Sequence, residues 1–274
     1  MTTLDNIPML AASMEVEGLP LSIRNPRQVM EQKLDGHRIL LRVQDGLSPL
    51  ALTRGGMPYT KALPKNLTRG LPAGRWVLDG ELVDGTYWVF DMLDANGMIS
   101  ESTPFSERRA ILEAFMSLVS TPCIRLVPQA VTQQEKQALV DRCRNEGAEG
   151  VMVKVLAGRY RPGARSVDVL KAKFVETADV VVLDVRDDGK DSVRLGAYQL
   201  TGQTLVDVGR SSLIGKEKNG KIQKGDVLEV RYLYMGSGDR LYQPTILRKR
   251  YDKLPQECTT DQFKHVSKKV LANF

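Results

Sequence analysis

The stretch EQKLDGHR, residues 31–38, places three charged side chains within six positions of one another. They are Lys33, Asp35 and Arg38, and Gly36 interrupts the run. A lysine becomes a nucleophile when desolvation or nearby cations lower its pKa. The stretch therefore fits two structures: a solvated charged loop, or the catalytic turn of an enzyme that uses Lys33 as its nucleophile.

Three further segments carry charged side chains of the kinds that bind phosphates and divalent metal ions. Cations neutralise phosphate oxygens, and carboxylates suit a hard divalent ion. In LKAK the two lysines alternate, so they share one face of an expected strand. The residues are Lys171 and Lys173 in LKAK, Asp79 and Glu81 in LDGEL, and Glu149 and Lys154 in EGVMVK.

Length and composition limit the classes of protein that this chain can be. Its 274 residues make one large domain or two ordinary ones, and 42% hydrophobic residues are enough for a sizeable core. The chain has no membrane-length apolar run and no signal-like start, so cytoplasm is the default location. Three separated cysteines form neither a disulfide framework nor a zinc cluster. The net charge of +6 favours a polyanionic partner such as nucleic acid, although many basic proteins bind none.

The elements that must position these residues change character near residue 175. Before it, the patterns predict a strand ending at Asp45-Gly46, a hairpin around Asp84-Gly85 and a buried strand at 149–156. They also predict a helix at 106–119 capped by Ser106, and one at 132–147 with a Thr132/Glu135 capping box. The charged side chains of these helices are predicted to face solvent; they are Arg108, Arg109, Lys136 and Arg142. Cys143 is predicted to pack against the core.

From residue 176, five short strands with one short helix, around 211–217, fit a small barrel such as an OB-fold. The tail at 259–274 is expected to form a last helix. The predicted fold class is α+β, with one domain at residues 1–175 and an OB-fold domain with its tail at 176–274.

Taken together, the motifs resemble those of the ATP-dependent DNA ligases of the covalent nucleotidyltransferase superfamily. KLDGHR matches that family's nucleophile motif K-x-D-G-x-R, and the others follow in the family's order. They are TRGG (53–56), LDGEL (78–82), FDML (90–93), EGVMVK (149–154), LKAK (170–173) and QPTILRKRYDK (243–253). K-x-D-G alone is a weak signal, whereas the ordered set spans nearly the whole chain and carries the resemblance.

The resemblance implies a nucleotidyltransferase (adenylation) domain and a three-step reaction. Lysine takes AMP from ATP, the AMP passes to the 5′-phosphate of a DNA nick, and the 3′-hydroxyl then displaces it. It further implies Mg²⁺, with Mn²⁺ as a substitute, nicked duplex DNA as partner, no membrane, and a monomer. It resembles the minimal ligases of phages and the accessory ligases of bacteria, without an N-terminal DNA-binding domain or a clamp insertion at 186–191.

The same resemblance assigns a role to each candidate residue. Lys33 is the nucleophile, and Lys171 and Lys173 neutralise the α-phosphate and lower the pKa of Lys33. The remaining roles are Glu31 and Phe90 at adenine, Arg38 and Arg54 at the ribose or the nick 5′-phosphate, Glu81 at the ribose and the metal, Glu149 at Mg²⁺, and Arg250 and Lys253 at the pyrophosphate in the first step only. An aromatic such as Phe90 is usually a core residue, and Arg54 also fits an ordinary loop charge.

Two positions depart from the family pattern. The last motif usually begins with an arginine two residues before its proline, where this chain has Tyr242, and Arg240 or Arg248 is a candidate substitute. The phosphate motif often starts with an aromatic, where this chain has Leu170. The basic loops at 52–70 and 215–225 fit DNA contact and solvated surface charge equally well.

Three other functions compete with this one. An RNA ligase or an mRNA-capping guanylyltransferase shares the superfamily, although capping enzymes usually carry Asp-Gly where this chain has Glu149-Gly150. An NAD-dependent ligase would need zinc cysteines and further domains. A non-catalytic OB-type protein would have no reason to combine Lys33, Glu81 and Lys171.

Overall fold

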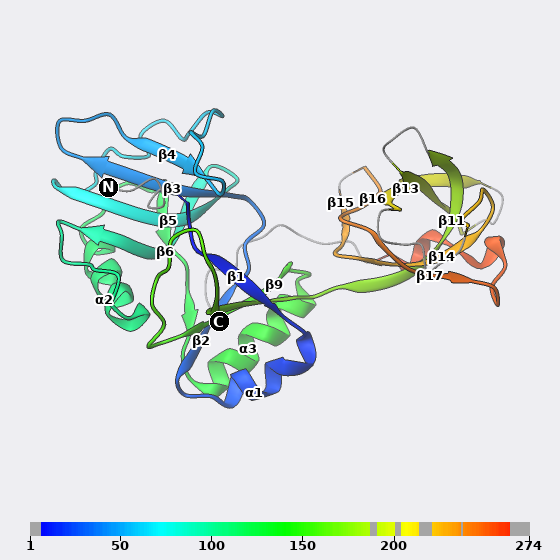
Figure 1. Cartoon of the computed structure of the whole chain (residues 1–274), viewed down its shortest axis with the longest axis horizontal. Coiled ribbons are helices and arrows are strands. Elements are labelled where there is room, and N and C mark those ends of the chain that lie inside the picture. Colours follow the sequence, from blue (N-terminus) through cyan, green and yellow to red (C-terminus); the bar gives the residue numbers. More distant parts are fainter. Residues whose placement is uncertain (1–6, 187–190, 201–203, 214–220, 237, 264–274) are drawn as a thin grey trace. The chain divides into compact units, whose positions relative to one another are not determined.

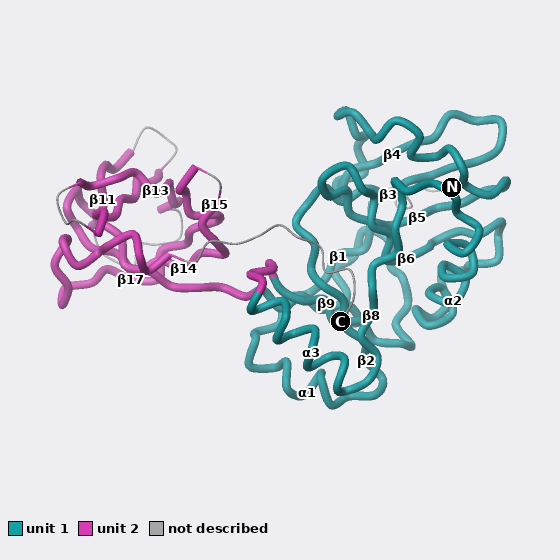
Figure 2. The backbone as a smooth tube through the Cα atoms, turned by 180° about the vertical axis from the view of Figure 1, so that it is seen from behind, with its two compact units in different colours: residues 1–145, 150–173, 269–274 teal, residues 146–149, 174–268 magenta. Residues whose placement is uncertain are grey.

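The computed structural model describes residues 7–186, 191–200, 204–213, 221–236 and 238–263. The chain divides into two compact units, which Figure 2 draws in different colours. The first comprises residues 1–145, 150–173 and 269–274, and the second comprises residues 146–149 and 174–268. Each unit has its own sheets (Figure 1), and each has its own hydrophobic core.

One five-stranded sheet of the first unit contains β2, the strand that leads into the Lys33 turn. Its order is β1-β10-β9-β2-β8, antiparallel except for the pair β1 and β10. The strands are β1 (Leu10–Met14), β2 (Gln28–Gln32), β8 (Gln129–Ala130), β9 (Gly150–Val155) and β10 (Arg165–Lys173). Helix α3 (Gln133–Asn145) packs on β2, β8 and β9, and α1 (Leu19–Arg24) packs against α3. Cys143 of α3 is fully buried, which confirms its predicted packing.

The second sheet of this unit has the order β4-β3-β5-β6-β7, with only β6 and β7 parallel. Its strands are β3 (His37–Gln44), β4 (Leu50–Thr53), β5 (Arg75–Val83), β6 (Thr86–Ala95) and β7 (Ile124–Leu126). Helix α2 (Phe105–Met116) covers β6, and buried Leu112 and Phe115 join the sheet's apolar residues in one core. The strands predicted before residue 175 are therefore confirmed.

The β5–β6 hairpin turns where the sequence predicts. Asp84 has φ of 45° and Gly85 has φ of 80°. Positive φ at both central residues is the type I′ turn, whose twist matches that of the flanking strands. Along the same hairpin the register shifts at Val77/Leu78 and at Asp79/Gly80, so the strand is irregular at the candidate motif.

The two long helices begin differently. In α3 the N–H of Glu135 donates to Thr132 Oγ1 at 3.2 Å, and Glu135 Oε2 accepts from the N–H of Thr132 at 2.8 Å, so the capping box is confirmed. The predicted Ser106 cap of α2 is wrong. Helix α2 begins after Pro104 without a side-chain cap, because the loop at 156–158 supplies carbonyl oxygens to its first N–H groups at 2.8 and 2.9 Å.

The helix charges are not the solvated faces that the sequence predicts. Arg108, Arg109 and Lys136 are buried and Arg142 is half-buried. Arg108 makes two hydrogen bonds of 2.8 Å to Asp91. Lys136 Nζ donates to the carbonyl oxygens of Asn25 and Gln28 at 2.7 and 3.0 Å, just beyond α1. Helical periodicity does not reveal such partners, because they lie more than fifteen residues away in sequence.

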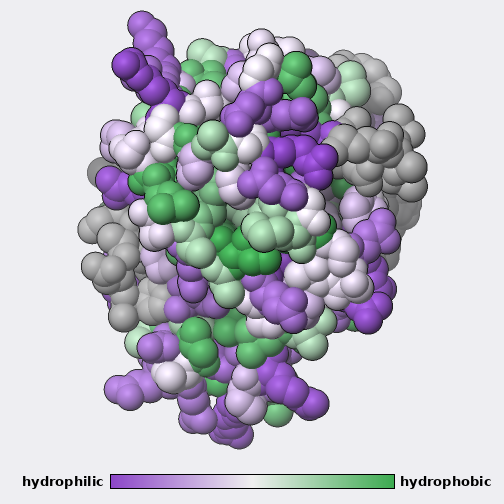
Figure 3. Space-filling model, turned by 90° about the vertical axis from the view of Figure 1, so that its left-hand side faces the viewer, coloured by the Kyte–Doolittle hydropathy of each residue, from purple (hydrophilic) through white to green (hydrophobic). Residues whose placement is uncertain are grey.

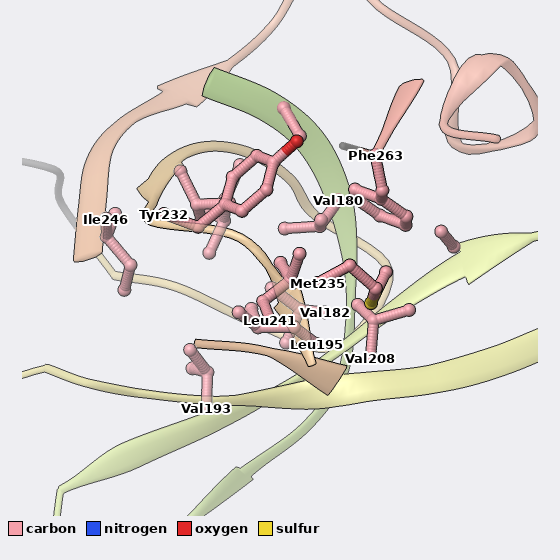
Figure 4. Close-up of a cluster of buried hydrophobic side chains, with 14 of the residues drawn as sticks. Val180, Val182, Val193, Leu195, Val208, Tyr232, Met235, Leu241, Ile246 and Phe263 are labelled. Carbon is pink, nitrogen blue, oxygen red and sulfur yellow. The ribbon is translucent and has the colours of Figure 1, made fainter. Parts of the chain in front are cut away.

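The second unit is built around an antiparallel sheet in the order β13-β12-β11-β14-β17. Its strands are β11 (Glu176–Arg186), β12 (Ser192–Tyr198), β13 (Leu205–Ser212), β14 (Val227–Tyr232) and β17 (Thr245–Arg250), with the small pair β15 (Met235–Gly236) and β16 (Arg240–Leu241). Figure 4 shows Val182, Leu195, Val208 and Leu241 among the apolar side chains of its core. The five strands predicted after residue 176 are confirmed as strands.

Some predictions fall partly outside the described residues. Of the short helix expected at 211–217, Ser211 and Ser212 belong to strand β13 instead, and residues 214–217 are outside. Residues 187–190 of the turn at 186–191, and residues 264–274 of the C-terminal helix expected at 259–274, also lie outside the described residues. Within that tail, Thr260–Gln262 forms a single 3₁₀ turn. In the part of the chain that the structure describes, no helix is long and apolar enough to span a membrane.

Candidate functional site

Lys33 lies directly after strand β2, in the turn that leads into β3. Its backbone N–H donates to the carbonyl oxygen of Gly150 at 2.9 Å, which ties the turn to the start of β9. A Cβ added to Gly36 would collide with the carbonyl of Leu82 and lie 2.8 Å from a methyl carbon of Val83. Glycine at this position therefore lets the turn pack directly against β5.

Glu31, two residues before Lys33, is a buried carboxylate with three polar neighbours. Lys154 Nζ lies 2.6 Å from Glu31 Oε2, and Gln129 Nε2 donates to Oε1 at 3.1 Å. Arg109 Nη1 is 3.6 Å from the same Oε1. The neighbours come from β9, β8 and α2, so this carboxylate links three elements around the Lys33 turn, and its side chain is only 2% exposed.

Arg38 is clamped by a buried aspartate. Its Nε and Nη2 donate to the two carboxylate oxygens of Asp79 at 2.9 and 2.6 Å, a bidentate pair. The hydroxyl of Tyr160 also donates to Asp79 Oδ2 at 2.7 Å and accepts the N–H of Met9 at 3.0 Å. Asp79 has no exposed surface, so its carboxylate acts entirely within this network.

A second aspartate lies opposite Asp79 in the β5–β6 ladder. This residue, Asp91, is Asp79's register partner, and like charges directly opposite destabilise a sheet. Each carboxylate has its own arginine, because Arg108 holds Asp91 as Arg38 holds Asp79. The guanidinium of Arg108 also lies 5.6 Å from the ring centroid of Tyr160, so the two networks adjoin.

Glu81, two residues after Asp79, is half-buried and faces cations. Burial raises the pKa of Glu81 to about 7, while Lys33, Arg38 and a hydrogen bond from the Gly36 backbone act in the opposite direction. Glu81 is also the register partner of Arg38 across β3 and β5. The carboxylate therefore lies beside both charged ends of the KLDGHR motif.

Positive charges gather around Lys171. Its pKa is lowered, first by burial and then by Lys173, Arg165, Arg54 and Lys33 in that order. These cations come from β10, the loop after β4 and the turn after β2. Such a set repels itself unless anions join it, which suits the phosphate groups of a nucleotide.

Phe90 offers its ring beside two cations. Lys154 Nζ lies 4.8 Å and the Arg38 guanidinium 5.4 Å from its centroid, and the ring packs against an apolar cluster that includes Leu34 and Trp88. Lys154 Nζ also donates to the carbonyl oxygen of Phe90 at 3.0 Å. The ring is half-buried and thus retains an accessible part.

The remaining candidates belong to the second unit. Glu149 is buried, directly before β9, and its carbonyl oxygen accepts the N–H of Phe174 at 3.0 Å. Arg250 Nη1 lies 3.1 Å and Lys253 Nζ 2.8 Å from the carboxylate of Asp179. Arg250 further pairs with Asp252 through Nε at 2.8 Å.

Tyr242, at the position where the resemblance expects an arginine, stacks on Tyr234. The ring centroids are 4.7 Å apart and the planes differ by 15°. Of the two candidate substitutes, Arg240 lies 3.6 Å from Asp207 and Arg248 Nε is 2.5 Å from Glu229. Both are more than half exposed, so neither is fixed in a buried site.

The structure thus brings Lys33, Glu81, Lys171, Lys173 and Arg54 together within the first unit, and Arg250 and Lys253 together within the second. Sequence reasoning missed several partners of these residues: Arg109, Gln129, Tyr160 and Asp179. Tyr160 and Asp179 lie outside the motifs, and helix periodicity assigns Arg109 to solvent. Lys154 and Asp79 belong to the motifs, but the sequence did not predict their ion-pair partners, Glu31 and Arg38.

Solved structures share this fold. The chain matches the ligase domain of LigD from M. tuberculosis with a TM-score of 0.57 and 24% identity, over 94% of this chain and 99% of that one. It matches a structure from a study of Lig E DNA ligases with a TM-score of 0.66 and 17% identity, over 89% and 100%. At these identities the likeness defines the class of fold, the mixed sheets with few helices seen in DNA ligase domains.

Sequence comparisons identify the family more narrowly. Residues 84–173 match the family described as the ATP dependent DNA ligase domain. A probable DNA ligase of Nocardioides sp. is 30% identical over 241 residues, which are 75% of this chain and 46% of that protein. The multifunctional non-homologous end joining protein LigD of Mycobacterium bovis is 31% identical over 201 residues, which are 65% of this chain and 25% of that protein. This chain carries a domain of the ATP-dependent DNA ligase family, and the resemblance predicted from its motifs is confirmed.

The chain spans less than half the length of these two curated relatives.

Proposed function

We propose that this chain is an ATP-dependent DNA ligase, which joins 5′-phosphate and 3′-hydroxyl ends at breaks in duplex DNA during replication, repair or recombination. One observation carries the proposal. Lys33, at the nucleophile position of the family, shares its surroundings with the cations Arg54, Lys171 and Lys173 and with the carboxylate of Glu81. A charged turn exposed to solvent would not need these charged neighbours.

The first step of the proposed reaction transfers AMP from ATP to Lys33. Lys33 Nζ attacks the α-phosphorus of ATP, a P–N bond forms, and the bond to the leaving pyrophosphate breaks. Lys171 and Lys173 neutralise charge that develops on the α-phosphate oxygens. Arg54 and Arg38 hold the ribose or, in the later steps, the 5′-phosphate at the nick.

The two later steps regenerate the lysine. The 5′-phosphate of the nick takes AMP from Lys33, which gives a DNA end with a 5′-5′ pyrophosphate linkage. The 3′-hydroxyl then attacks that end, the phosphodiester bond forms and AMP leaves. Positioning and charge neutralisation account for most of the catalysis in each step.

Phe90 and Glu31 frame the adenine pocket in this proposal. The half-buried ring of Phe90 offers a face for a purine. Glu31 holds Lys154, whose Nζ lies against that ring, so Glu31 fixes the shape of the pocket through its ion pair.

The proposed divalent metal ion is expected to bind together with the substrate. Among the described residues no group of three or more His, Cys, Asp or Glu side chains forms a metal cluster. Mg²⁺ commonly binds one or two carboxylates together with phosphate oxygens and water, and the resemblance assigns Glu81 and Glu149 as its protein ligands. When bound, Mg²⁺ would neutralise charge on the phosphates, and Mn²⁺ would substitute.

The second unit is proposed to be the OB-fold domain, from residue 176, with residues 1–175 as the adenylation domain. Its Arg250 and Lys253 orient the pyrophosphate in the first step only. The supporting observation is that these two cations share one carboxylate and therefore lie close together. Nicked duplex DNA is the partner, and a monomer is sufficient for the three steps.

The direct test is sealing of a 5′-phosphorylated nick in duplex DNA with ATP and Mg²⁺. Wild-type protein should seal it and Lys33→Ala should not. Parallel reactions use substrates with RNA ends, or GTP in place of ATP. Sealing of RNA ends alone, or use of GTP alone, would replace this proposal with an RNA ligase or a capping guanylyltransferase.

A further inference from the structure

The last motif of the chain ends in two cations that are held by an aspartate outside any motif. Asp179 lies on β11, and its side chain is 13% exposed. One of its carboxylate oxygens, Oδ2, accepts Lys253 Nζ at 2.8 Å and Arg250 Nη1 at 3.3 Å, and Oδ1 accepts Arg250 Nη1 at 3.1 Å. Two cations this close repel each other, and the shared carboxylate offsets that repulsion.

Asp179 is itself fixed by Gln262. The N–H of Asp179 donates to Gln262 Oε1 at 2.8 Å, and Gln262 Nε2 donates to the carbonyl oxygen of Asp179 at 2.9 Å. A further hydrogen bond from Gln262 Nε2 to Thr259, at 2.7 Å, anchors the amide. The amide therefore holds the backbone of Asp179 much as a neighbouring strand would.

Arg250 also pairs with a second carboxylate, that of Asp252. Asp252 accepts Arg250 Nε at 2.8 Å and Nη2 at 2.9 Å, but the Asp252 side chain is 69% exposed. The pKa of Lys253 is raised, first by its hydrogen bond to Asp179. Asp179 is thus the group that the two cations have in common.

We propose that Asp179 is a positioning residue for the first step of ligation, because it holds Arg250 and Lys253 side by side for the pyrophosphate group of ATP. This inference rests on the proposed function. It predicts a defect confined to transfer of AMP from ATP, since pyrophosphate takes no part in the two later steps.

Two variants and a matched control test this role. Asp179→Asn removes the charge, and Asp179→Glu keeps the charge but displaces it by one methylene. Asp226→Asn is the control, because Asp226 pairs with Lys249 at 2.7 Å, with side-chain exposures of 19% and 16% close to those of Asp179 and Arg250. Two reactions are measured in a single turnover: formation of the lysine–AMP adduct from ATP and Mg²⁺, and sealing of a nick whose 5′ end already carries AMP.

The expected result is separation of the two reactions. Asp179→Asn should form the adduct at least about tenfold more slowly than wild type, because positioning is lost. Asp179→Glu should form the adduct at a rate between those of wild type and Asp179→Asn. All three variants should seal the pre-adenylylated nick at the wild-type rate. Asp226→Asn should match wild type in both reactions.

Either of two results would overturn the role of Asp179. One is adduct formation at the wild-type rate by both Asp179 variants. The other is an equal loss of both reactions, which would mark a purely structural residue. Absence of an adduct in wild-type protein is a separate outcome, because it rejects the proposed function itself.

Discussion

At the residue scale, the site is a set of charges whose partners decide what each can do. The resemblance of the motifs to those of DNA ligases predicted that Lys33, Glu81 and the two lysines of β10 belong together, and their side chains do influence one another. The sequence could not predict that Asp79 would clamp Arg38 with the help of Tyr160. Tyr160 lies 81 positions from Asp79, and only the packed fold brings its hydroxyl to that carboxylate.

Glu81 gives a pH dependence at this scale. Its folded-state pKa of about 7 lies above the ordinary value of 4.5, because burial disfavours the charged carboxylate. Between these values the folded state binds more protons than the unfolded state, so the stabilisation present below pH 4.5 is lost as the pH rises towards 7. Without metal, stability should fall over this window by an amount on the order of 3 kcal/mol at most.

Glu81→Gln is the variant for this measurement. Urea unfolding in a chelating buffer at pH 5 and pH 8 should show a smaller fall in the free energy of unfolding than in wild type. The same fall in both proteins would assign the pH dependence to other groups.

Tyr160 gives a second prediction at this scale. Tyr160→Phe removes the hydroxyl that donates to Asp79, whereas Tyr87→Phe removes a buried hydroxyl that lies 2.9 Å from the backbone carbonyls of Ile39 and Leu78. Each should lower the free energy of unfolding by roughly 1–2 kcal/mol, because a buried partner loses its hydrogen bond. Only Tyr160→Phe should also slow nick sealing, since only it loosens Arg38.

Equal sealing rates in the two phenylalanine variants would show that the Tyr160 hydroxyl has no role in positioning Arg38. Guanidinium or urea titration of both proteins shows whether their stabilities are matched.

At the element scale, alternation and turn chemistry predicted the strands well. The β5–β6 hairpin and the α3 capping box follow from local sequence, because their determinants lie within a few residues. The start of α2 does not, because carbonyls of the 156–158 loop replace the side-chain cap. The buried charges Arg108 of α2 and Lys136 of α3 were wrongly predicted for the same reason, because their partners are distant in sequence.

Gly80 shows how closely the elements of the site approach one another. A Cβ at this position would lie 2.6 Å from the carbonyl oxygen of Trp88 and 2.7 Å from the ring of Tyr87. Gly80→Ala should therefore destabilise the fold by about 1–3 kcal/mol, since backbone must move. Thermal unfolding of Gly80→Ala is compared with that of Gly55→Ala, whose Cβ would meet only Thr53 Oγ1 at 4.0 Å.

If Gly80→Ala unfolded at the wild-type temperature, the strands would have room that the structure does not show.

At the scale of the whole molecule, a basic chain is expected to bind DNA largely through phosphates. The net charge is +6, and polar and apolar side chains are interspersed over the face in Figure 3. The loop after β4 adds Lys65 and Arg69, both exposed. Composition only favoured a polyanionic partner, and charge alone does not say which surface would bind it.

The salt dependence of DNA affinity in surface variants can identify the surface that binds DNA. Lys65→Ala with Arg69→Ala should lower the slope of log affinity against log salt by about 2, since each lost phosphate contact removes about 0.9. The charge-matched control is Arg24→Ala with Arg27→Ala, two exposed arginines near α1. Fluorescence anisotropy with a nicked duplex from 50 to 200 mM salt measures the slope. An equal change in both double variants would make the loop ordinary surface charge.

The role of Lys33 as the nucleophile is measured most directly by finding the site of AMP attachment. Protein is incubated with ATP and Mg²⁺, digested, and each lysine-containing peptide is weighed by mass spectrometry. We expect AMP on Lys33, held by an acid-labile P–N bond, and no adduct in Lys33→Ala. AMP on any other lysine, or no AMP on the wild-type protein, would contradict it.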